Sequence, residues 1–330
     1  MPPDVVSQAV APEVIPIPGS VRSRIAAHVG MMRLDHSIKQ AFILPGIVLA
    51  IALSGRALDW HLALGTVVGL ISATLIASSN YVLNEMLDAP YDRLHPTKRL
   101  RPAACGLIHS GLGYTQWIVL MLLGVAMGWT ISAGFAINCA ALWVMGCVYN
   151  IPPLRSKDVP YLDVLSESVN NPIRFCLGWY IVTSAMLPPL SLLIAYWMVG
   201  AYFMSLKRFS EYRQIGDPVR AGNYRKSFRS YTSESLLTSV VFYAAAAMLF
   251  FGAFIMRYRM ELILCFPVVA WVMSIYFNLS FGNDSPVQNP EKLYRERKLM
   301  VALALCVILI SFLLFIHIPW LNSIFPKSHV

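Results

Sequence analysis

Residues 84–102 read NEMLDAPYDRLHPTKRLRP and follow directly on an apolar run long enough to cross a membrane. Asn84, Asp88 and Asp92 are spaced four residues apart, so on a continuing helix they would share one face. Two carboxylates and an amide oxygen are hard oxygen ligands that suit Mg²⁺, which commonly bridges to the phosphates of a substrate. The segment therefore predicts a magnesium site for a phosphorylated substrate at a membrane surface.

Pro90 interrupts this spacing. It disfavours a helix at Ala89 and removes a backbone hydrogen bond, so we expect the helix to fray there and the following turn to present Asp92. Three basic side chains that can bind the same phosphates come next: Lys98, Arg99 and Arg101. The alternative is a solvated loop beside the membrane whose charges form incidental ion pairs.

Membrane-spanning helices must hold these residues in place. The chain has 330 residues, of which 57% are hydrophobic and 13% charged, whereas a soluble domain is about a quarter charged. Its apolar runs predict an all-α polytopic membrane protein with nine spans, at 38–55, 62–83, 112–130, 133–149, 162–182, 187–206, 235–255, 261–280 and 299–319. The fifth span is the most polar, and such a span survives only if it faces a protein interior or a wet cavity.

Positive charge is distributed unevenly between the two sides of the predicted bundle. The N-terminal segment and the loops after the even-numbered spans hold 21 of the 26 lysines and arginines. The positive-inside rule therefore places the N-terminus and the loops of the candidate site in the cytoplasm, and the C-terminus on the opposite side of an inner or plasma membrane. Attraction to anionic lipid headgroups would explain the basic residues, but not the carboxylates interleaved with them.

The N-terminal residues 1–20 hold five prolines and no basic residue. They predict a disordered tail rather than a cleaved targeting signal, which leaves 21–330 as a single transmembrane domain. The six cysteines include no CxxC pair, so neither a disulfide framework nor a zinc site is indicated. Membrane lipid is the expected surrounding and nucleic acid is not an expected partner, while a homo-oligomer is left open.

The stretch NEMLDAPYD resembles the first aspartate-rich motif of the UbiA superfamily of intramembrane prenyltransferases, NDxxDxxxD followed by a basic segment that ends in RP. Glu85 stands where aspartate is usual and reaches one methylene further. The resemblance implies nine helices around a central cavity that opens to the cytoplasm. It also implies a Mg²⁺ ion bound by Asn84, Asp88 and Asp92, with Glu85 as a further ligand, and the first three as the catalytic residues.

The loop after the sixth span reads LKRFSEYRQIGDPVRAGNYRKSFRSYTSES and departs from the usual pattern of that superfamily. Typical members carry a second aspartate motif there and bind an isoprenyl diphosphate between the two motifs. This loop has no DxxxD and holds seven basic residues. It therefore gains capacity to bind anions and loses capacity to bind metal, which suits a donor with phosphate at more than one end.

These features resemble one branch of the superfamily, the decaprenyl-phosphate 5-phosphoribosyltransferases. The matching stretches are HPTKRLRP, FMSLKRFSEY, RKSFRSYTS and NPEKLYRERKLM, in the same order. The resemblance implies Mg²⁺-dependent transfer of 5-phosphoribosyl from phosphoribosyl diphosphate (PRPP) to a polyprenyl phosphate, with release of pyrophosphate. The product would be a lipid-linked pentose donor for a cell-envelope glycan.

Two groups of substrate-binding residues are expected: the resemblance indicates Tyr149 and Lys157, and Asp163 and Arg174 are eleven residues apart, so they would share a helix face. The donor's phosphates would be bound by Lys98, Arg99, Arg101, Lys207, Arg208, Glu211, Tyr212, Arg225, Lys226 and Tyr231. The acceptor phosphate or the cavity would be lined by Lys39, Tyr149, Lys157, Asp163 and Arg174. For Asp163 and Arg174 a buried network that joins helices is an equal alternative, and Lys39 could instead extend from the membrane edge to water.

Two other classes of function remain as alternatives. A conventional UbiA enzyme that prenylates an aromatic ring would need a second aspartate motif, and a terpene cyclase of this superfamily meets the same objection. A lipid or metabolite transporter should show gating residues at both mouths and often a pseudo-symmetric repeat, and neither is clear in this sequence.

Overall fold

The computed structural model describes residues 21–93, 98–288 and 290–324, so the predicted disordered tail lies outside the described residues. The described part contains helices and no strands. In chain order the helices are α1 (Val21–Met31), η1 (Leu34–Ile43), α2 (Leu44–Ser54), α3 (Trp60–Asp92), η2 (Lys98–Leu100), α4 (Ser110–Trp129), α5 (Ala133–Asn150), η3 (Ser156–Asp158), α6 (Leu162–Ser168), α7 (Asn170–Val182), α8 (Leu190–Ile215), α9 (Pro218–Tyr224), η4 (Lys226–Ser230), α10 (Ser233–Tyr258), η5 (Met260–Cys265), α11 (Phe266–Leu279), η6 (Pro286–Gln288), η7 (Pro290–Arg295), α12 (Arg297–Phe315) and α13 (Pro319–Ile324).

Eight helical stretches of the described chain are long and apolar enough to span a membrane, so the predicted count of nine is not confirmed. The difference lies at the fifth predicted span. There the chain forms two shorter helices, α6 and α7, which are separated at Val169. The residues that make this span polar lie on these two helices: Asp163, Glu167, Asn170, Asn171 and Arg174. A single transmembrane domain and a central cavity open to the cytoplasm stay predictions.

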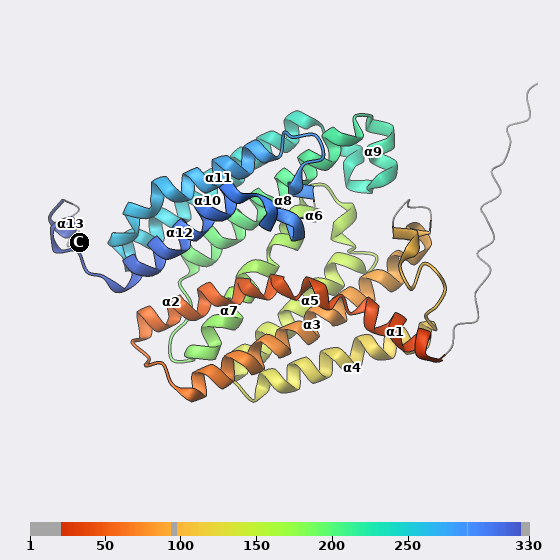
Figure 1. The fold of residues 1–330 in the computed structure, drawn as a ribbon, viewed down its shortest axis with the longest axis horizontal. Coiled ribbons are helices and arrows are strands. Elements are labelled where there is room, and N and C mark those ends of the chain that lie inside the picture. Colours follow the sequence, from red (N-terminus) through yellow and green to blue (C-terminus); the bar gives the residue numbers. More distant parts are fainter. Residues whose placement is uncertain (1–20, 94–97, 289, 325–330) are drawn as a thin grey trace, which may run out of the picture.

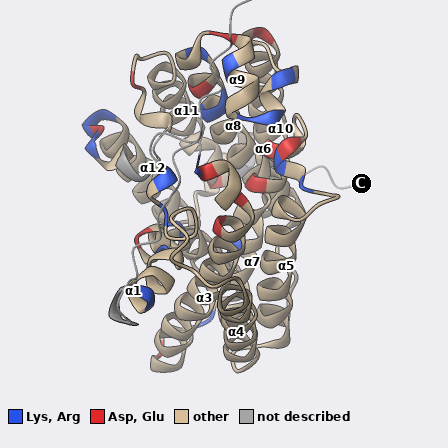
Figure 2. Ribbon diagram, turned by 90° about the vertical axis from the view of Figure 1, so that its right-hand side faces the viewer, with Lys and Arg blue, Asp and Glu red and all other residues tan. Residues whose placement is uncertain are grey.

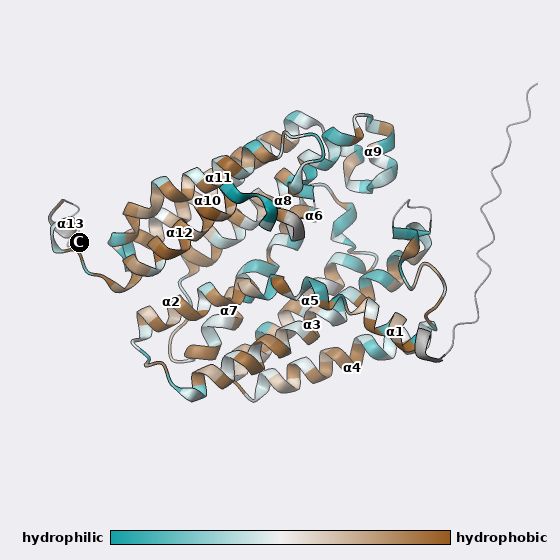
Figure 3. Cartoon of the chain, viewed as in Figure 1, coloured by the Kyte–Doolittle hydropathy of each residue, from teal (hydrophilic) through white to brown (hydrophobic). Residues whose placement is uncertain are grey.

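The long helices form two halves, with α1 to α5 and α7 in one half and α8 and α10 to α12 in the other (Figure 1). In the first half α3 packs against α4 and α5, and in the second α8 packs against α10. The short helix α9 lies at one end of the bundle and α13 at the other. Most of the long helices are strongly hydrophobic, whereas hydrophilic residues gather towards the end that carries α9 (Figure 3).

This hydrophilic end is called the polar end below and comprises the last turns of α3 with the segments 98–109, 151–161 and 216–232. Helix-capping residues define several of its boundaries. Asp217 begins α9 by accepting a hydrogen bond from Arg220 N at 2.6 Å, and Thr232 begins α10 with a reciprocal bond to Ser235. Gly216 ends α8 in the left-handed conformation that glycine adopts without strain.

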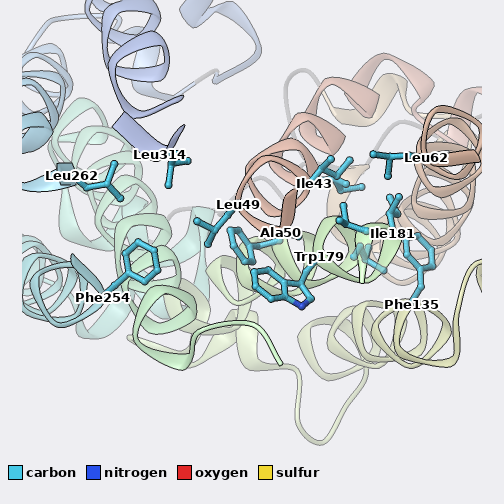
Figure 4. Close-up of a cluster of buried hydrophobic side chains, with 14 of the residues drawn as sticks. Ile43, Leu49, Ala50, Leu62, Phe135, Trp179, Ile181, Phe254, Leu262 and Leu314 are labelled. Carbon is cyan, nitrogen blue, oxygen red and sulfur yellow. The ribbon is translucent and has the colours of Figure 1, made fainter. Parts of the chain in front are cut away.

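A buried apolar cluster joins the two halves away from the polar end. Leu49 and Trp179 of the first half lie towards Phe254, Leu262 and Leu314 of the second (Figure 4). Burial of such side chains is worth roughly 1.5–3 kcal/mol each in water, but in lipid the contribution comes mainly from close packing.

Two glycines allow α2 and α7 to approach closely. A Cβ atom on Gly46 would lie 2.0 Å from the carbonyl oxygen of Phe175, and one on Gly178 would lie 2.0 Å from that of Ile43. Small residues of this kind permit backbone contact between membrane helices. The contact holds η1, directly before α2, against the side of α7.

The expectation that α3 frays at Pro90 is wrong, because the helix continues to Asp92. Pro90 removes only one backbone bond close to the end of the helix, and Arg93 N still donates to Ala89 O at 3.2 Å. Asp92 is 5% exposed and is held by Arg101, so a tertiary ion pair supports the last turn. The carboxylate of Asp92 is therefore presented by the helix itself.

Candidate active site

The last turns of α3 carry Asp88, which lies between two cations of the loop after α5. Lys157 Nζ donates to both carboxylate oxygens of Asp88, at 2.7 and 2.8 Å. Arg155 Nη2 donates to Asp88 Oδ1 at 2.9 Å. This loop follows the C-terminal end of α5, so the packing of α5 against α3 brings both cations to the carboxylate.

Lys157 is buried, and its ammonium group is surrounded by side-chain oxygen atoms. Besides Asp88, Nζ donates to Asn84 Oδ1 at 3.2 Å and to Asn150 Oδ1 at 2.8 Å. Burial lowers the pKa of Lys157 from its ordinary value of 10.5, and the nearby charge of Asp88 opposes that effect. Asn84, Asp88 and Asn150 thus form an oxygen cage around a positive charge.

The oxygen cage bears on whether the site suits magnesium. No group of three or more histidine, cysteine, aspartate or glutamate side chains among the described residues is placed to hold a metal. Mg²⁺, however, is commonly bound by one or two carboxylates together with water and substrate phosphates. Asn84 and Asp88 already place hard oxygen atoms around the Lys157 ammonium, so the donor set fits a cation that would exchange with Lys157.

The other acidic residues of the first motif are held by the segment after α3. Asp92 Oδ2 accepts a hydrogen bond from Arg101 Nη1 at 2.6 Å. Glu85 is 1% exposed, accepts from the backbone of Ala103 at 3.2 Å and lies 3.8 Å from Arg33. Asp92 therefore lies beside the cluster with its own cation, and Glu85 fixes the loop that carries Arg101.

Lys98 and Arg99 lie on η2, at the rim of the site. Burial lowers the pKa of Lys98, and its Nζ lies 5.5 Å from the ring centre of Tyr224 on α9. Arg99 is exposed. The contact between Lys98 and Tyr224 brings the loop after α3 next to the loop after α8, so the two basic loops meet across the bundle.

Tyr91 forms the other side of this rim. Its ring lies 5.5 Å from the guanidinium of Arg155 and 5.7 Å from the ammonium of Lys226. Lys226 also pairs with Asp158 at 3.2 Å and remains half exposed. Figure 2, in which the polar end faces the viewer, shows cationic and acidic residues on both halves of the bundle.

A second cluster is centred on Asp163 of α6, which is fully buried. Its carboxylate accepts hydrogen bonds from Arg208 Nε at 3.1 Å, Ser227 Oγ at 3.2 Å and Tyr231 OH at 2.7 Å, and Arg225 Nε lies 3.3 Å away. Burial and the adjacent Asp163 charge raise the pKa of the Tyr231 hydroxyl. Asp163 thus ties α6 and α8 to the loop that precedes α10.

Arg208 is the central cation of this second cluster. It is 3% exposed and pairs with Asp163, with Glu167 at 2.9 Å and with Glu211 at 3.2 Å. Tyr149 OH donates to Glu167 at 3.0 Å and accepts from Arg225 at 3.1 Å. The three acidic residues on this side of the site are therefore all bonded to arginine, although the two arginines carry one charge fewer than the three carboxylates.

The remaining predicted residues lie outside both clusters. Tyr212 packs edge-on against Phe228 at 5.7 Å, and Lys207 is partly buried on α8. Arg174 of α7 contacts Gln40, and Lys39 lies over the ring of Tyr81. The structure therefore does not bring Asp163 and Arg174 together: each belongs to a different group of side chains.

Sequence reasoning missed several residues of the site: Asn150, Arg155, Asp158, Glu167 and Ser227. Three of them lie in the stretch YNIPPLRSKD, where basic, acidic and amide side chains alternate immediately beyond a predicted span. A similar alternation identified the first motif, so the sequence contained a signal that could have identified these three residues. Arg155 adopts a positive φ of 23°, and this uncommon conformation is held by its bonds to Asp88 and Asp158.

Comparison with known proteins identifies the family. The model of the UbiA prenyltransferase family matches residues 42–303. The chain is 28% identical over 226 residues to decaprenyl-phosphate phosphoribosyltransferase of Mycolicibacterium smegmatis, covering 68% of each protein. It is 32% identical over 180 residues to that of Mycobacterium tuberculosis, covering 54% of this chain but only 57% of the relative.

Its fold is similar to that of a UbiA homologue from Archaeoglobus fulgidus solved with DMAPP and Mg²⁺, with a TM-score of 0.64 at 20% identity over 87% of this chain and 98% of the other. That likeness agrees with the all-helical bundle described above. The chain is an integral membrane transferase and belongs to the UbiA prenyltransferase family.

Proposed function

We propose that this chain transfers 5-phosphoribosyl from PRPP to a polyprenyl phosphate, such as decaprenyl phosphate, and releases pyrophosphate. One observation carries the choice of donor. On the side where a second metal-binding motif would be needed, Asp163, Glu167 and Glu211 are all paired with Arg208. These carboxylates are therefore engaged by arginine rather than free to bind a second metal, and the same side also carries Lys207, Arg225 and Lys226, which favours a donor with several phosphates. The relatives from both mycobacteria carry the name of this activity.

The donor's phosphates would be bound by cations of the polar end, and those that now pair with Asp88, Asp92, Asp158 or Asp163 would exchange these carboxylates for phosphate. We assign this role to Lys98, Arg99, Arg101, Lys157, Arg155, Lys207, Arg225 and Lys226. Arginine is suited to bidentate phosphate contacts, and lysine provides compact charge. Arg208, Glu211, Tyr212 and Tyr231 would position this surface, because their side chains are engaged in the second cluster or packed beside it.

Asn84, Asp88 and Asp92 would hold Mg²⁺ when the donor binds. Bound there, the metal would neutralise charge on the diphosphate that leaves. Lys157 would then contact the donor's phosphates instead of the oxygen cage. Glu85 is left with the structural role of holding the segment at Ala103.

The chemical step needs little from the protein beyond position and charge. An acceptor phosphate oxygen attacks C1 of the ribose while the bond from C1 to the diphosphate oxygen breaks, and pyrophosphate leaves with that electron pair. A phosphate monoester is largely ionised at pH 7, because its second pKa is about 6, so no strong general base is required. The fixed cations of the site supply the electrostatic stabilisation.

We further propose that the polar end faces the cytoplasm and that the C-terminus lies on the opposite side. This rests on the excess of lysine and arginine in the loops of that end. The product would serve as a lipid-linked pentose donor for a cell-envelope glycan.

Purified protein in detergent tests the proposed activity. It is incubated with Mg²⁺, a polyprenyl phosphate and PRPP labelled in the ribose, and label entering the organic phase is followed. Transfer that stops on addition of EDTA is the expected result. No transfer of label, together with consumption of an isoprenyl diphosphate, would instead favour prenyl transfer. Prenyl transfer is the second candidate function, because the Archaeoglobus homologue of similar fold was solved with DMAPP.

A further inference from the structure

Arg174 of α7 is buried, at 8% exposed, and forms no ion pair with a carboxylate of the described residues. Its Nε donates to Gln40 Oε1 at 3.3 Å and its Nη1 to the backbone oxygen of Asn170 at 3.4 Å, both long hydrogen bonds. Arg208, which is similarly buried, contacts three carboxylates. A buried cation without an opposite charge is costly, so Arg174 suits an anion that the chain itself does not supply.

Two further cations lie near Arg174, around Tyr81 of α3. Lys39 Nζ and the Arg33 guanidinium each lie 5.9 Å from the centre of the Tyr81 ring. Lys39 forms no ion pair within the described part of the chain, whereas Arg33 reaches Glu85 only at 3.8 Å. Glu167 is close enough to interact with the charges of Arg174 and Lys39, but its carboxylate is already paired with Arg208 at 2.9 Å. Positive charge therefore exceeds negative charge at this position.

The position is rigid and adjoins the Asp88 cluster. Gln40 and Lys39 belong to η1, which the close contact of Gly46 and Gly178 holds against α7. Tyr81 precedes Asn84 by three residues of α3, which corresponds to about 5 Å along the helix axis. Tyr81 therefore lies about one helical turn before the oxygen cage along α3, whereas Arg33 extends from its ring to Glu85, level with the cage.

The surroundings of Lys39 are apolar and exposed. Ile38 is 73% exposed and Phe42 39% exposed, and both lie on η1 within the candidate span Arg24–Ser54. An anion that binds here from the bilayer would place an attached hydrocarbon chain against these side chains. The expected ligand therefore has a phosphate headgroup and an apolar tail.

We propose that Arg174 and Lys39 bind the phosphate of the lipid acceptor, in a subsite separate from that of the donor. The inference rests on the proposed function and refines it. Tyr149, Lys157 and Asp163, which the sequence grouped with these two cations, belong to the two clusters on the donor side. The acceptor phosphate would thus approach the donor from the membrane side of the oxygen cage.

Binding without turnover tests the subsite. Protein in detergent with EDTA and without PRPP is titrated with farnesyl phosphate, and the shift in melting temperature gives the dissociation constant. Farnesol and inorganic phosphate serve as probes of the tail and the headgroup alone. We expect Arg174→Gln and Lys39→Gln to raise the dissociation constant for farnesyl phosphate about tenfold or more, and Arg174→Lys to retain part of the affinity. Arg213→Gln, which removes an exposed contact to the backbone of Phe281, should leave it unchanged.

Equal affinity for farnesyl phosphate in the wild-type protein, Arg174→Gln and Lys39→Gln would overturn the proposal. If the two variants bind ribose 5-phosphate more weakly than the wild-type protein but bind farnesyl phosphate equally well, the subsite belongs to the donor. That result would also overturn the proposal. If Arg174→Gln does not fold, the partly exposed Lys39 carries the test alone. Because no transfer is measured, failure here differs from failure of the phosphoribosyl transfer assay.

Discussion

Lys157 Nζ lies 2.7 and 2.8 Å from the two carboxylate oxygens of Asp88, although 69 residues separate these side chains in the sequence. The ammonium occupies the position in which the first aspartate motif is expected to hold a metal. The same carboxylate would therefore serve a cation of the protein in the free enzyme and Mg²⁺ in the complex with the donor.

Asp88→Asn should reduce transfer at least about 100-fold, because the substitution removes the charge that attracts the metal and Lys157. The initial rate of label transfer measures the effect, and membrane insertion should be unchanged. Asp35→Asn changes the charge of an exposed residue and should retain the wild-type rate. A normal rate in Asp88→Asn would remove Asp88 from the metal site.

The alkaline limb of the pH profile should report on Lys157. Because burial lowers its pKa from 10.5, the ammonium is present below the lowered pKa and is lost as the pH rises through it. We expect kcat/KM for PRPP to fall at a pH below 10.5, and Lys157→Arg to move this fall to higher pH, since guanidinium keeps its proton. Lys298→Arg, at an exposed position outside the site, is the control. An alkaline limb that Lys157→Arg leaves in place would contradict the assignment.

Removal of Arg208 should destabilise the protein strongly. Arg208→Met leaves Asp163, which is fully buried, without its main charge partner, at a cost of about 3–5 kcal/mol. The melting temperature in detergent should fall well below that of Arg229→Met, which changes an exposed arginine. Addition of Asp163→Asn to Arg208→Met should recover part of the loss; a double variant less stable than the single one would refute the charge explanation.

Gly178→Ala should loosen the contact between α2 and α7. The added Cβ would lie 2.0 Å from Ile43 O, a backbone atom that cannot move independently of its helix, and overpacking of this kind costs about 1–3 kcal/mol. Gly252→Ala is a matched control, because no atom lies within 4 Å of its added Cβ. The melting temperatures should separate the two variants, and equal values would show that the close approach does not contribute to stability.

Much of the fold could be predicted from the sequence, because long apolar runs and the segregation of charge are local properties of the chain. Those runs predicted the membrane class, and the resemblance of NEMLDAPYD to a known aspartate-rich motif indicated the family. At two places tertiary contacts gave a structure that differs from the local prediction. The helix continues past Pro90 because Arg101 holds Asp92, and the polar fifth span forms two short helices whose side chains are paired within the bundle.

The amino-acid sequence specifies which charges occur at the polar end, whereas the packing of the helices specifies which of them are paired. Lys157 pairs with Asp88 and Arg208 with Asp163 because helix packing brings distant loops together, and no spacing along the chain encodes these pairs. The same packing leaves Arg174 without an ion pair to a carboxylate among the described residues. A buried charge is costly unless an opposite charge pairs with it. Arg208, paired with Asp163, therefore supports the fold, whereas Arg174 remains available to bind an anion.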